Sequence, residues 1–217
     1  MKTLQNIHID SSNAILVVVD VENEFCKPGG KLYNETSAQI MPGVFCGIQK
    51  LLRQARGANI PIVYIQSVRT LQEAEFTVFA CPEILKRGTW ASEICEEVKP
   101  LKGETIVPKF CHDPFFRPEL DRILRELVPD PTKCYAIVTG GNINICVYAT
   151  VMGFHLRDYW TVVPLDSVYY MSEGGYRAAV DQFSEGEPYP NIFLTRSDLI
   201  EVSHDPALLR HRPTPGC

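Results

Sequence analysis

Three residues that can take part in hydrolytic chemistry follow short runs of apolar, mostly β-branched residues: Asp20, Lys109 and Cys146. Ligands of open parallel sheets bind beyond the carboxyl ends of the strands, so residues that end strands are the first to inspect. A thiolate is the nucleophilic form of cysteine, and a free thiol with a pKa of ~8.5 is mostly protonated at neutral pH. We expect Asp20 to accept the thiol proton of Cys146, while Lys109 keeps Asp20 ionised and favours the thiolate.

Each of these residues also has an ordinary structural explanation. A strand-terminal Asp often caps a turn, a strand-terminal Lys usually extends to water, and a Cys near a helix start is often a small buried apolar residue. Cys146 follows a glycine-containing turn, so we expect it at a helix N-terminus, where free N–H groups and the helix dipole favour an anion. Cys26 and Cys111 lie close to Asp20 and Lys109 in sequence but begin no expected helix, so they rank below Cys146 as nucleophiles.

The elements that must position these residues alternate between strands and helices. The apolar runs predict strands at about 14–20, 61–66, 105–109, 134–140, 161–166 and 192–195. Periods typical of amphipathic helices occur at about 44–55, 120–128 behind Pro118, 146–157 and 173–183. Continuous apolar strands alternating with such helices are typical of a parallel sheet covered on both faces. The sequence therefore predicts a three-layer α/β/α sandwich.

One stretch, residues 67–91, has no sustained period. A connection of this length inside a compact domain is often an active-site lid or binding loop, and a surface excursion with a short helix is the alternative. We predict one domain over residues 1–217, with its core at about 13–203 and a mobile tail after His204.

Composition excludes several classes of partner. The 21 Lys and Arg residues against 26 Asp and Glu residues give a net charge of −5, which argues against binding to nucleic acid or anionic membranes. The longest apolar run, 14–19, is too short to cross a bilayer, and the N-terminus does not resemble an export signal, so we expect a cytoplasmic location. The eight cysteines are interpreted as thiols, and the spacing of Cys and His indicates no zinc site, so no metal or other cofactor is expected.

Four segments together resemble a known family. Residues 20–30, D-V-E-N-E-F-C-K-P-G-G, resemble the D-x-Q-N-D-F-x-x-P-G-G opening of the isochorismatase-like cysteine hydrolases. Residues 87–93, 107–109 and 140–147 are similar to the family's R-G-T-x-x-x-E loop, V-x-K strand and G-x-x-T-x-x-C-V elbow, in the same order. The resemblance extends from about Asn13 to Leu199, nearly the whole chain.

The resemblance implies a catalytic triad of Asp20, Lys109 and Cys146 on a six-stranded parallel sheet. It implies hydrolysis of a C–N bond in a small carboxamide, carbamoyl or urea-like compound, through a thioester and with release of ammonia. Members that cleave a vinyl ether lack the nucleophilic Cys, so Cys146 favours amide hydrolysis. Nicotinamidases carry a D-x-H metal-binding sequence after the second strand, whereas residues 66–70 here contain no His, which disfavours a metal.

The elbow is also where the resemblance places the oxyanion hole. It implies a cis peptide at Gly141–Asn142 and stabilisation of the oxyanion by the N–H groups of Asn142 and Cys146. Ile143 stands where the family usually has Thr, so a hydroxyl that could order the turn is absent.

The pocket itself departs from the family pattern. Glu22 replaces the usual Gln and is expected either to contact substrate and tune its choice or to be a structural residue. Phe25, Trp90, Phe115 and Phe116 are expected to form pocket walls, although packing in the core or at an interface explains each of them equally well. The family's habit suggests a homodimer or homotetramer. The alternative to an enzyme is a catalytically silent domain that acts in binding or assembly.

Overall fold

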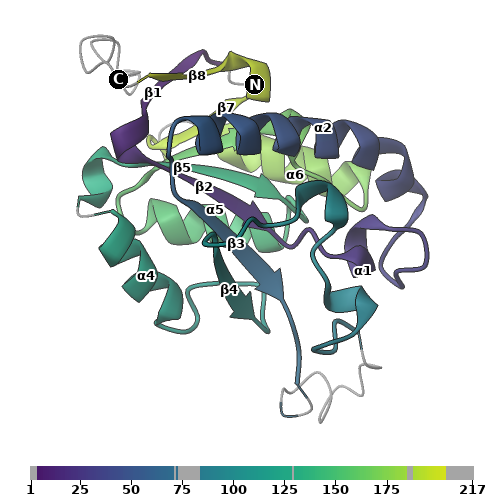
Figure 1. Cartoon of the computed structure of the whole chain (residues 1–217). Helices are drawn as coiled ribbons and strands as arrows, with labels where there is room; N and C mark the ends of the chain where they lie inside the picture. Colours follow the sequence, from purple (N-terminus) through teal and green to yellow (C-terminus); the bar gives the residue numbers. More distant parts are fainter. Residues whose placement is uncertain (1–3, 71, 73–83, 129, 185–187, 204–217) are drawn as a thin grey trace.

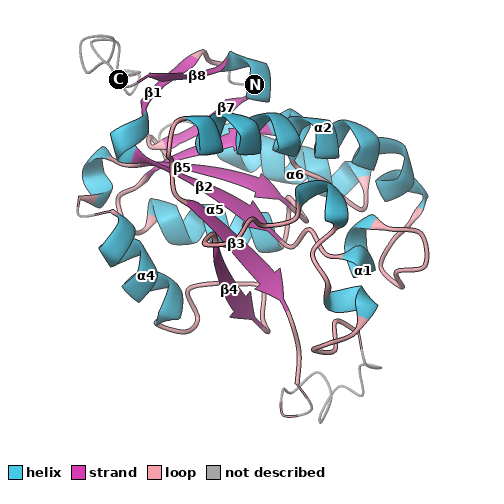
Figure 2. Ribbon diagram, viewed as in Figure 1, coloured by secondary structure: helices cyan, strands magenta, loops and turns pink. Residues whose placement is uncertain are grey.

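The predicted sandwich is present in the computed structural model, which describes residues 4–70, 72, 84–128, 130–184 and 188–203 (Figures 1 and 2). Six parallel strands form the main sheet in the order β4-β3-β2-β5-β6-β7. They are β2 (Ala14–Val19), β3 (Ile62–Ser67), β4 (Thr105–Lys109), β5 (Tyr135–Gly140), β6 (Trp160–Pro164) and β7 (Ile192–Thr195). These strands lie within two residues of the predicted ones, so the fold class is confirmed.

Helices cover both faces of this sheet (Figure 1). The helix α2 (Glu35–Gly57) packs on one face, and α4 (Glu119–Leu127), α5 (Cys146–His155) and α6 (Glu173–Ser184) pack on the other. Every residue of β2 is buried, because alternate side chains enter the two apolar layers. The short helix α1 (Asn23–Cys26) directly follows β2 and Asp20. Short 3₁₀ helices lie at Ser11–Asn13, Trp90–Ser92, Glu96–Val98, Pro131–Lys133, Leu165–Ser167 and Ser197–Leu199.

Two features were not predicted. β1 (Ile7–Asp10) and β8 (Ile200–Ser203) pair in parallel as a separate two-stranded sheet at the chain's two ends. The helix α2 begins at Glu35, well before the predicted start near residue 44, because Asn34 caps it by accepting a 2.9 Å hydrogen bond from the Ser37 N–H. The Pro42-Gly43 pair resembles a helix break in sequence, yet the helix continues through it.

Two predictions fall largely outside the described residues: the mobile tail after His204, and residues 73–83 of the proposed lid. Within the described part of the chain, no helix is long and apolar enough to cross a membrane.

The strand order creates a topological switch point between β2 and β5. From β2 the chain passes to β3 and β4 on one side, and then returns to β5 on the other side of β2. Crossovers diverge at such a point and leave a crevice at the carboxyl ends of the two strands. Asp20 follows β2 there, and Cys146 follows the turn after β5.

Candidate active site

Asp20 is fixed at the end of β2 by its own backbone. Its N–H donates to the Ile65 carbonyl at 2.9 Å, and its carbonyl accepts a 2.7 Å hydrogen bond from the Tyr169 hydroxyl. Its φ of 50° is in the left-handed region, which few residues other than Gly adopt, although Asp is among the more tolerant. With this backbone conformation, the fully buried carboxylate points toward β3 and β4, where it contacts Ser67 and Lys109.

Lys109 reaches this carboxylate from the edge strand β4, across β3. Its Nζ lies 2.7 Å from Asp20 Oδ2 and also donates to the Cys111 carbonyl at 3.1 Å. Ser67, which ends the intervening strand β3, joins the two groups: its hydroxyl donates to Asp20 Oδ1 and accepts from Lys109 Nζ, each at 2.9 Å. All three residues are buried, so the charges are compensated by each other rather than by water.

The pKa of the Cys146 thiol differs from the expectation that Lys109 and the helix start would stabilise a thiolate. Burial is the largest single influence on Lys109 and would lower its pKa, but the charges of Asp20, Cys146 and Glu22 and the hydrogen bond to Asp20 together raise that pKa above its ordinary value. Burial raises the pKa of the Cys146 thiol, the Asp20 charge raises it further, and Lys109 only partly opposes them. The resting thiol is therefore protonated, and its proton must move to a neighbouring base before the sulfur can act as a nucleophile.

The turn that presents Cys146 depends on close backbone contacts. Gly140 has a φ of 95°, and a Cβ there would lie 1.9 Å from the Val19 carbonyl oxygen, so no larger residue fits beside β2. The Gly141–Asn142 peptide is cis, as predicted. The Asn142 carbonyl accepts from the N–H groups of Ile145 and Val147, whereas the N–H groups of Asn142 and Cys146 have no carbonyl partner among the described residues.

Glu22 lies behind the pocket rather than in its wall. It is fully buried, Oε1 accepts a 2.9 Å hydrogen bond from the Ser67 N–H, and Oε2 has no hydrogen-bond partner among the described residues. Burial, and then the nearby Asp20 charge, raise its pKa well above the ordinary value. A buried carboxyl group that holds the end of β3 corresponds to the structural alternative considered for Glu22, and substrate contact by this residue stays a prediction.

A cavity of about 230 Å³ opens beside the thiol and is the candidate active site. Its lining combines the Asp20–Lys109–Cys146 group with apolar side chains and consists of Asp20, Phe25, Leu32, Ser67, Arg69, Ile84, Leu85, Lys109, Cys111, His112, Asn142, Ile145, Cys146 and Met171. Phe25 thus occupies the wall position expected for it. The cavity is large enough only for a small substrate.

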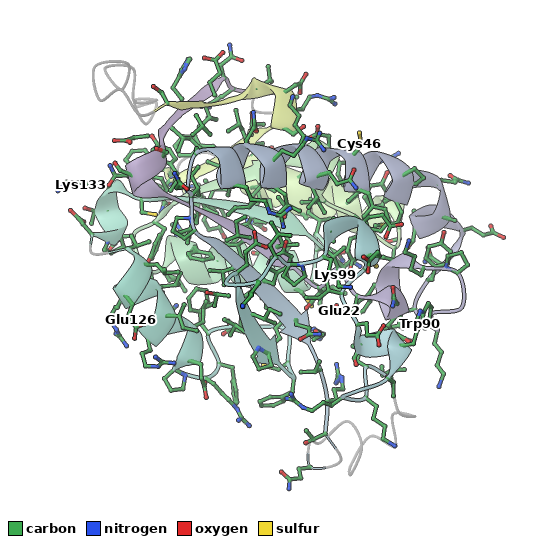
Figure 3. The ribbon with its side chains drawn as sticks, viewed as in Figure 1. Glu22, Cys46, Trp90, Lys99, Glu126 and Lys133 are labelled. Atoms are coloured by element: carbon green, nitrogen blue, oxygen red, sulfur yellow. The ribbon has the colours of Figure 1, made fainter. Side chains whose placement is uncertain are left out.

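The other aromatic residues expected in the wall lie elsewhere. Phe115 packs edge-on against Phe154, and the Arg157 guanidinium lies 3.9 Å from its ring centre, because Gly153 leaves room for the ring. Trp90 is 48% exposed near the surface (Figure 3), and Phe116 is also exposed. Substrate contact by Trp90 or Phe115 stays a prediction that this packing does not favour.

Sequence reasoning missed three polar residues of the pocket lining, Ser67, Arg69 and His112, as well as its aliphatic residues. Ser67 ends β3, so the rule that selected Asp20 and Lys109 would also have selected it. His112 lies three residues after Lys109, and its Nδ1 is 3.5 Å from Cys146 Sγ. Arg69 is buried, and its backbone is fixed by hydrogen bonds with Leu85 and Arg87.

The remaining cysteines support the choice of Cys146. The six described cysteines are free thiols, as predicted for them. Cys26 is buried beside Cys95, and burial raises its pKa well above the ordinary value. Cys111 lines the cavity, but its Sγ is 3.3 Å from the Asp113 carbonyl. Among the described residues, no cluster of three His, Cys, Asp or Glu side chains is arranged to hold a metal ion.

A second and larger hollow, of about 660 Å³, lies along α2 and contains a thiol and several charges. Lys50 and Arg53 of α2, with Asp166 and Arg196 opposite, contribute charges, and Cys46 is exposed on the outer side of the helix (Figure 3). Asp166 accepts from the Ser197 N–H and hydroxyl at 2.8 and 2.7 Å. We call this hollow the α2 groove.

The chain has an α/β fold with a cysteine at the switch point of its parallel sheet, and sequence comparison identifies the family to which it belongs. The isochorismatase domain model matches residues 14–191, so the chain belongs to the isochorismatase family. The chain is 30% identical over 175 residues to a ureidoacrylate amidohydrolase, RutB, of Pseudomonas savastanoi pv. phaseolicola, covering 71% of this chain and 69% of that protein.

Solved structures show the same fold. A cysteine hydrolase from Pseudomonas syringae pv. phaseolicola superposes with a TM-score of 0.75 at 24% identity, covering 91% of this chain and 94% of that one. The N-carbamoylsarcosine amidase of Thermoplasma acidophilum superposes with a TM-score of 0.69 at 24% identity, covering 86% and 97%. The match to the isochorismatase domain model confirms the family resemblance noted in the sequence.

Proposed function

We propose that this protein is a cysteine amidohydrolase that cleaves a C–N bond of a small carboxamide, carbamoyl or ureido compound and releases ammonia. The observation that carries the proposal is the buried Asp20–Lys109 ion pair, 2.7 Å between Nζ and Oδ2, beside the Cys146 thiol at the start of α5. The similarity to a ureidoacrylate amidohydrolase supports the same bond type. The substrate itself is not identified by these observations.

In the proposed reaction, Sγ of Cys146 bonds to the substrate carbonyl carbon as its proton passes to a neighbouring base. The N–H groups of Asn142 and Cys146 are proposed to stabilise the oxyanion. The base returns the proton to the leaving nitrogen, the C–N bond breaks and ammonia departs. Water then attacks the thioester, the C–S bond breaks, and Sγ regains a proton.

Lys109 is assigned an electrostatic role. Its positive charge compensates the Asp20 carboxylate and is close enough to influence the Cys146 thiol. When the thiolate forms, Lys109 lies beside a second anion and stabilises it. A cytoplasmic location and a homo-oligomeric state stay predictions, as does the absence of a cofactor.

Ammonia release from a panel of small amides tests the proposal. The panel contains a ureido acid, an N-carbamoyl amino acid, an unsubstituted carboxamide and nicotinamide, each assayed with the wild type and with Cys146→Ala. We expect ammonia from at least one compound with the wild type and none above background with the variant. The proposal is wrong if the folded wild type releases no ammonia from any panel member, or if both proteins release it equally. The first result would favour the alternative of a catalytically silent binding domain.

A further inference from the structure

His112 makes a direct contact with the nucleophile that the Asp20–Lys109–Cys146 arrangement does not use. Its Nδ1 is 3.5 Å from Cys146 Sγ, within hydrogen-bonding range for sulfur, and both residues line the same cavity. The residue is exposed, so its imidazole also exchanges protons with water. A titratable ring therefore connects the buried thiol to solvent.

The loop that carries His112 is held on both sides of the residue. Before it, Lys109 Nζ donates to the Cys111 carbonyl at 3.1 Å. After it, the Asp113 side chain accepts from the Phe115 N–H at 2.8 Å. The same lysine that pairs with Asp20 thus positions the backbone next to His112, so the contact with sulfur is part of an ordered turn.

A histidine also suits the proton that must be moved. The ordinary pKa of His, ~6.5, is much closer to that of a thiol, ~8.5, than the ~3.9 of Asp. Burial and the Asp20 charge raise the pKa of the Cys146 thiol, so its proton is better matched by an imidazole, the stronger base, than by a carboxylate. Asp20 is moreover engaged by both Lys109 and Ser67.

We infer that His112 is a second catalytic residue, which accepts the Cys146 proton to form a thiolate–imidazolium pair and passes that proton to the leaving nitrogen. The lone pair of Nδ1 takes the S–H proton, and the S–H electron pair then forms the C–S bond. When the C–N bond breaks, the nitrogen keeps its electrons and takes the imidazolium proton. Asp20 keeps Lys109 in place and remains available as the base for the hydrolytic water. The second half of this inference rests on the proposed amidohydrolase function.

Several charged groups face this pair and set its balance. Asp20 at the end of β2 and Asp113 on the same loop favour the imidazolium, whereas Lys109 on β4 and Arg69 after β3 oppose it. The thiols of Cys146 on α5 and Cys111 on the loop are the other titratable groups of the lining. The ordinary pKa of a histidine side chain, ~6.5, lies within the pH range of the test below.

The test is the pH dependence of alkylation at Cys146, because this reaction needs no substrate. Wild type and His112→Gln are treated with iodoacetamide from pH 5 to 9, and modification is mapped to individual cysteines by mass spectrometry. The wild type should show a step in rate in the range of a histidine, and His112→Gln should lose this step, with at least a tenfold slower rate at pH 7. His155→Gln is the matched control, since His155 contacts Asn191 rather than the pocket. Cys46, exposed on α2, serves as the internal reference thiol.

Superimposable Cys146 profiles for wild type and His112→Gln would overturn the inference. A wild-type profile without a step in the histidine range would also overturn it, and this result decides the matter even if the variant does not fold. Either result leaves the ammonia assay unaffected, so failure of the His112 role is distinguishable from failure of the amidohydrolase function. Where ammonia release is found, imidazole added to His112→Ala should restore part of kcat, which a merely structural histidine would not allow.

Discussion

The two hollows of this protein are the cavity beside Cys146 and the α2 groove, and the smaller of them has the stronger features of an active site. The groove is larger, about 660 Å³ against about 230 Å³, and it also contains a thiol and basic side chains. In the small cavity, however, a fully buried Asp–Lys pair lies beside a buried thiol at the β2–β5 switch point. Volume is therefore a weaker indicator of chemistry than buried charges that converge on one reactive atom.

The largest expected effect separates the thiols of the two hollows. Cys146→Ala should reduce ammonia release to background because the nucleophile is lost, while the melting temperature changes little because only a small side chain is removed. Cys46→Ala is the matched control and should keep kcat within about twofold, since Cys46 is exposed on α2. The reverse pattern would move the active site to the α2 groove.

Breaking the buried ion pair should have the next largest effect. Asp20→Asn removes a carboxylate beside the thiol and should lower kcat by about 10²–10⁴-fold. Lys109→Met should act on the same site, so the double variant should lose far less than the product of the two single losses. Steady-state kinetics of the four proteins provide the cycle, and fully multiplicative losses would show that the two residues act independently.

Glu22→Gln should have a smaller effect on rate and a pH-dependent effect on stability. Asp20 and Lys109 remain, so kcat should fall less than about tenfold. Because burial raises the pKa of Glu22 in the folded protein, the folded state binds its proton more tightly, and stability is lost as pH rises above ~4.3, the value for an unfolded chain. The melting temperature of the variant relative to wild type should therefore increase from pH 4 to pH 7. A difference that is constant with pH would show that Glu22 is not held neutral.

The smallest effect should come from the α2 groove. Arg53→Gln removes an exposed positive charge from that hollow and should change kcat/KM by less than about twofold for every substrate in the panel. A rise in KM for some substrates and not for others would show that the α2 groove takes part in substrate binding, contrary to the distinction drawn between the two hollows.

Much of this arrangement is predictable because it depends on local signals. The β-branched runs locate the six strands of the main sheet, and strand-terminal Asp20 and Lys109 follow from the rule that ligands bind beyond carboxyl ends. The parallel pairing of β1 with β8 was not predictable, because it joins short segments from opposite ends of the chain. The raised pKa of Cys146 also escaped prediction, since it depends on burial, which outweighs the helix start and Lys109.

The contact between His112 and Cys146 escaped prediction for a related reason. The two residues are 34 positions apart, and only the folded β4–α4 loop brings the imidazole to the sulfur. Phe115, three residues further along that loop, was expected in the pocket but packs in the core against Phe154. In irregular segments, tertiary contacts determine where each side chain points, and the periodicity of the sequence contains no information about these contacts.

The most direct test of the central claim is to find the acyl group on the enzyme. Wild-type protein is mixed with a compound that it hydrolyses, quenched in acid within the first turnover, and digested for mass mapping of every cysteine-containing peptide. A thioester at Cys146, with Cys46 unmodified, is the result that the account predicts. Ammonia released by Cys146→Ala at the wild-type rate, with no acyl group on Cys146 in the wild type, would contradict it.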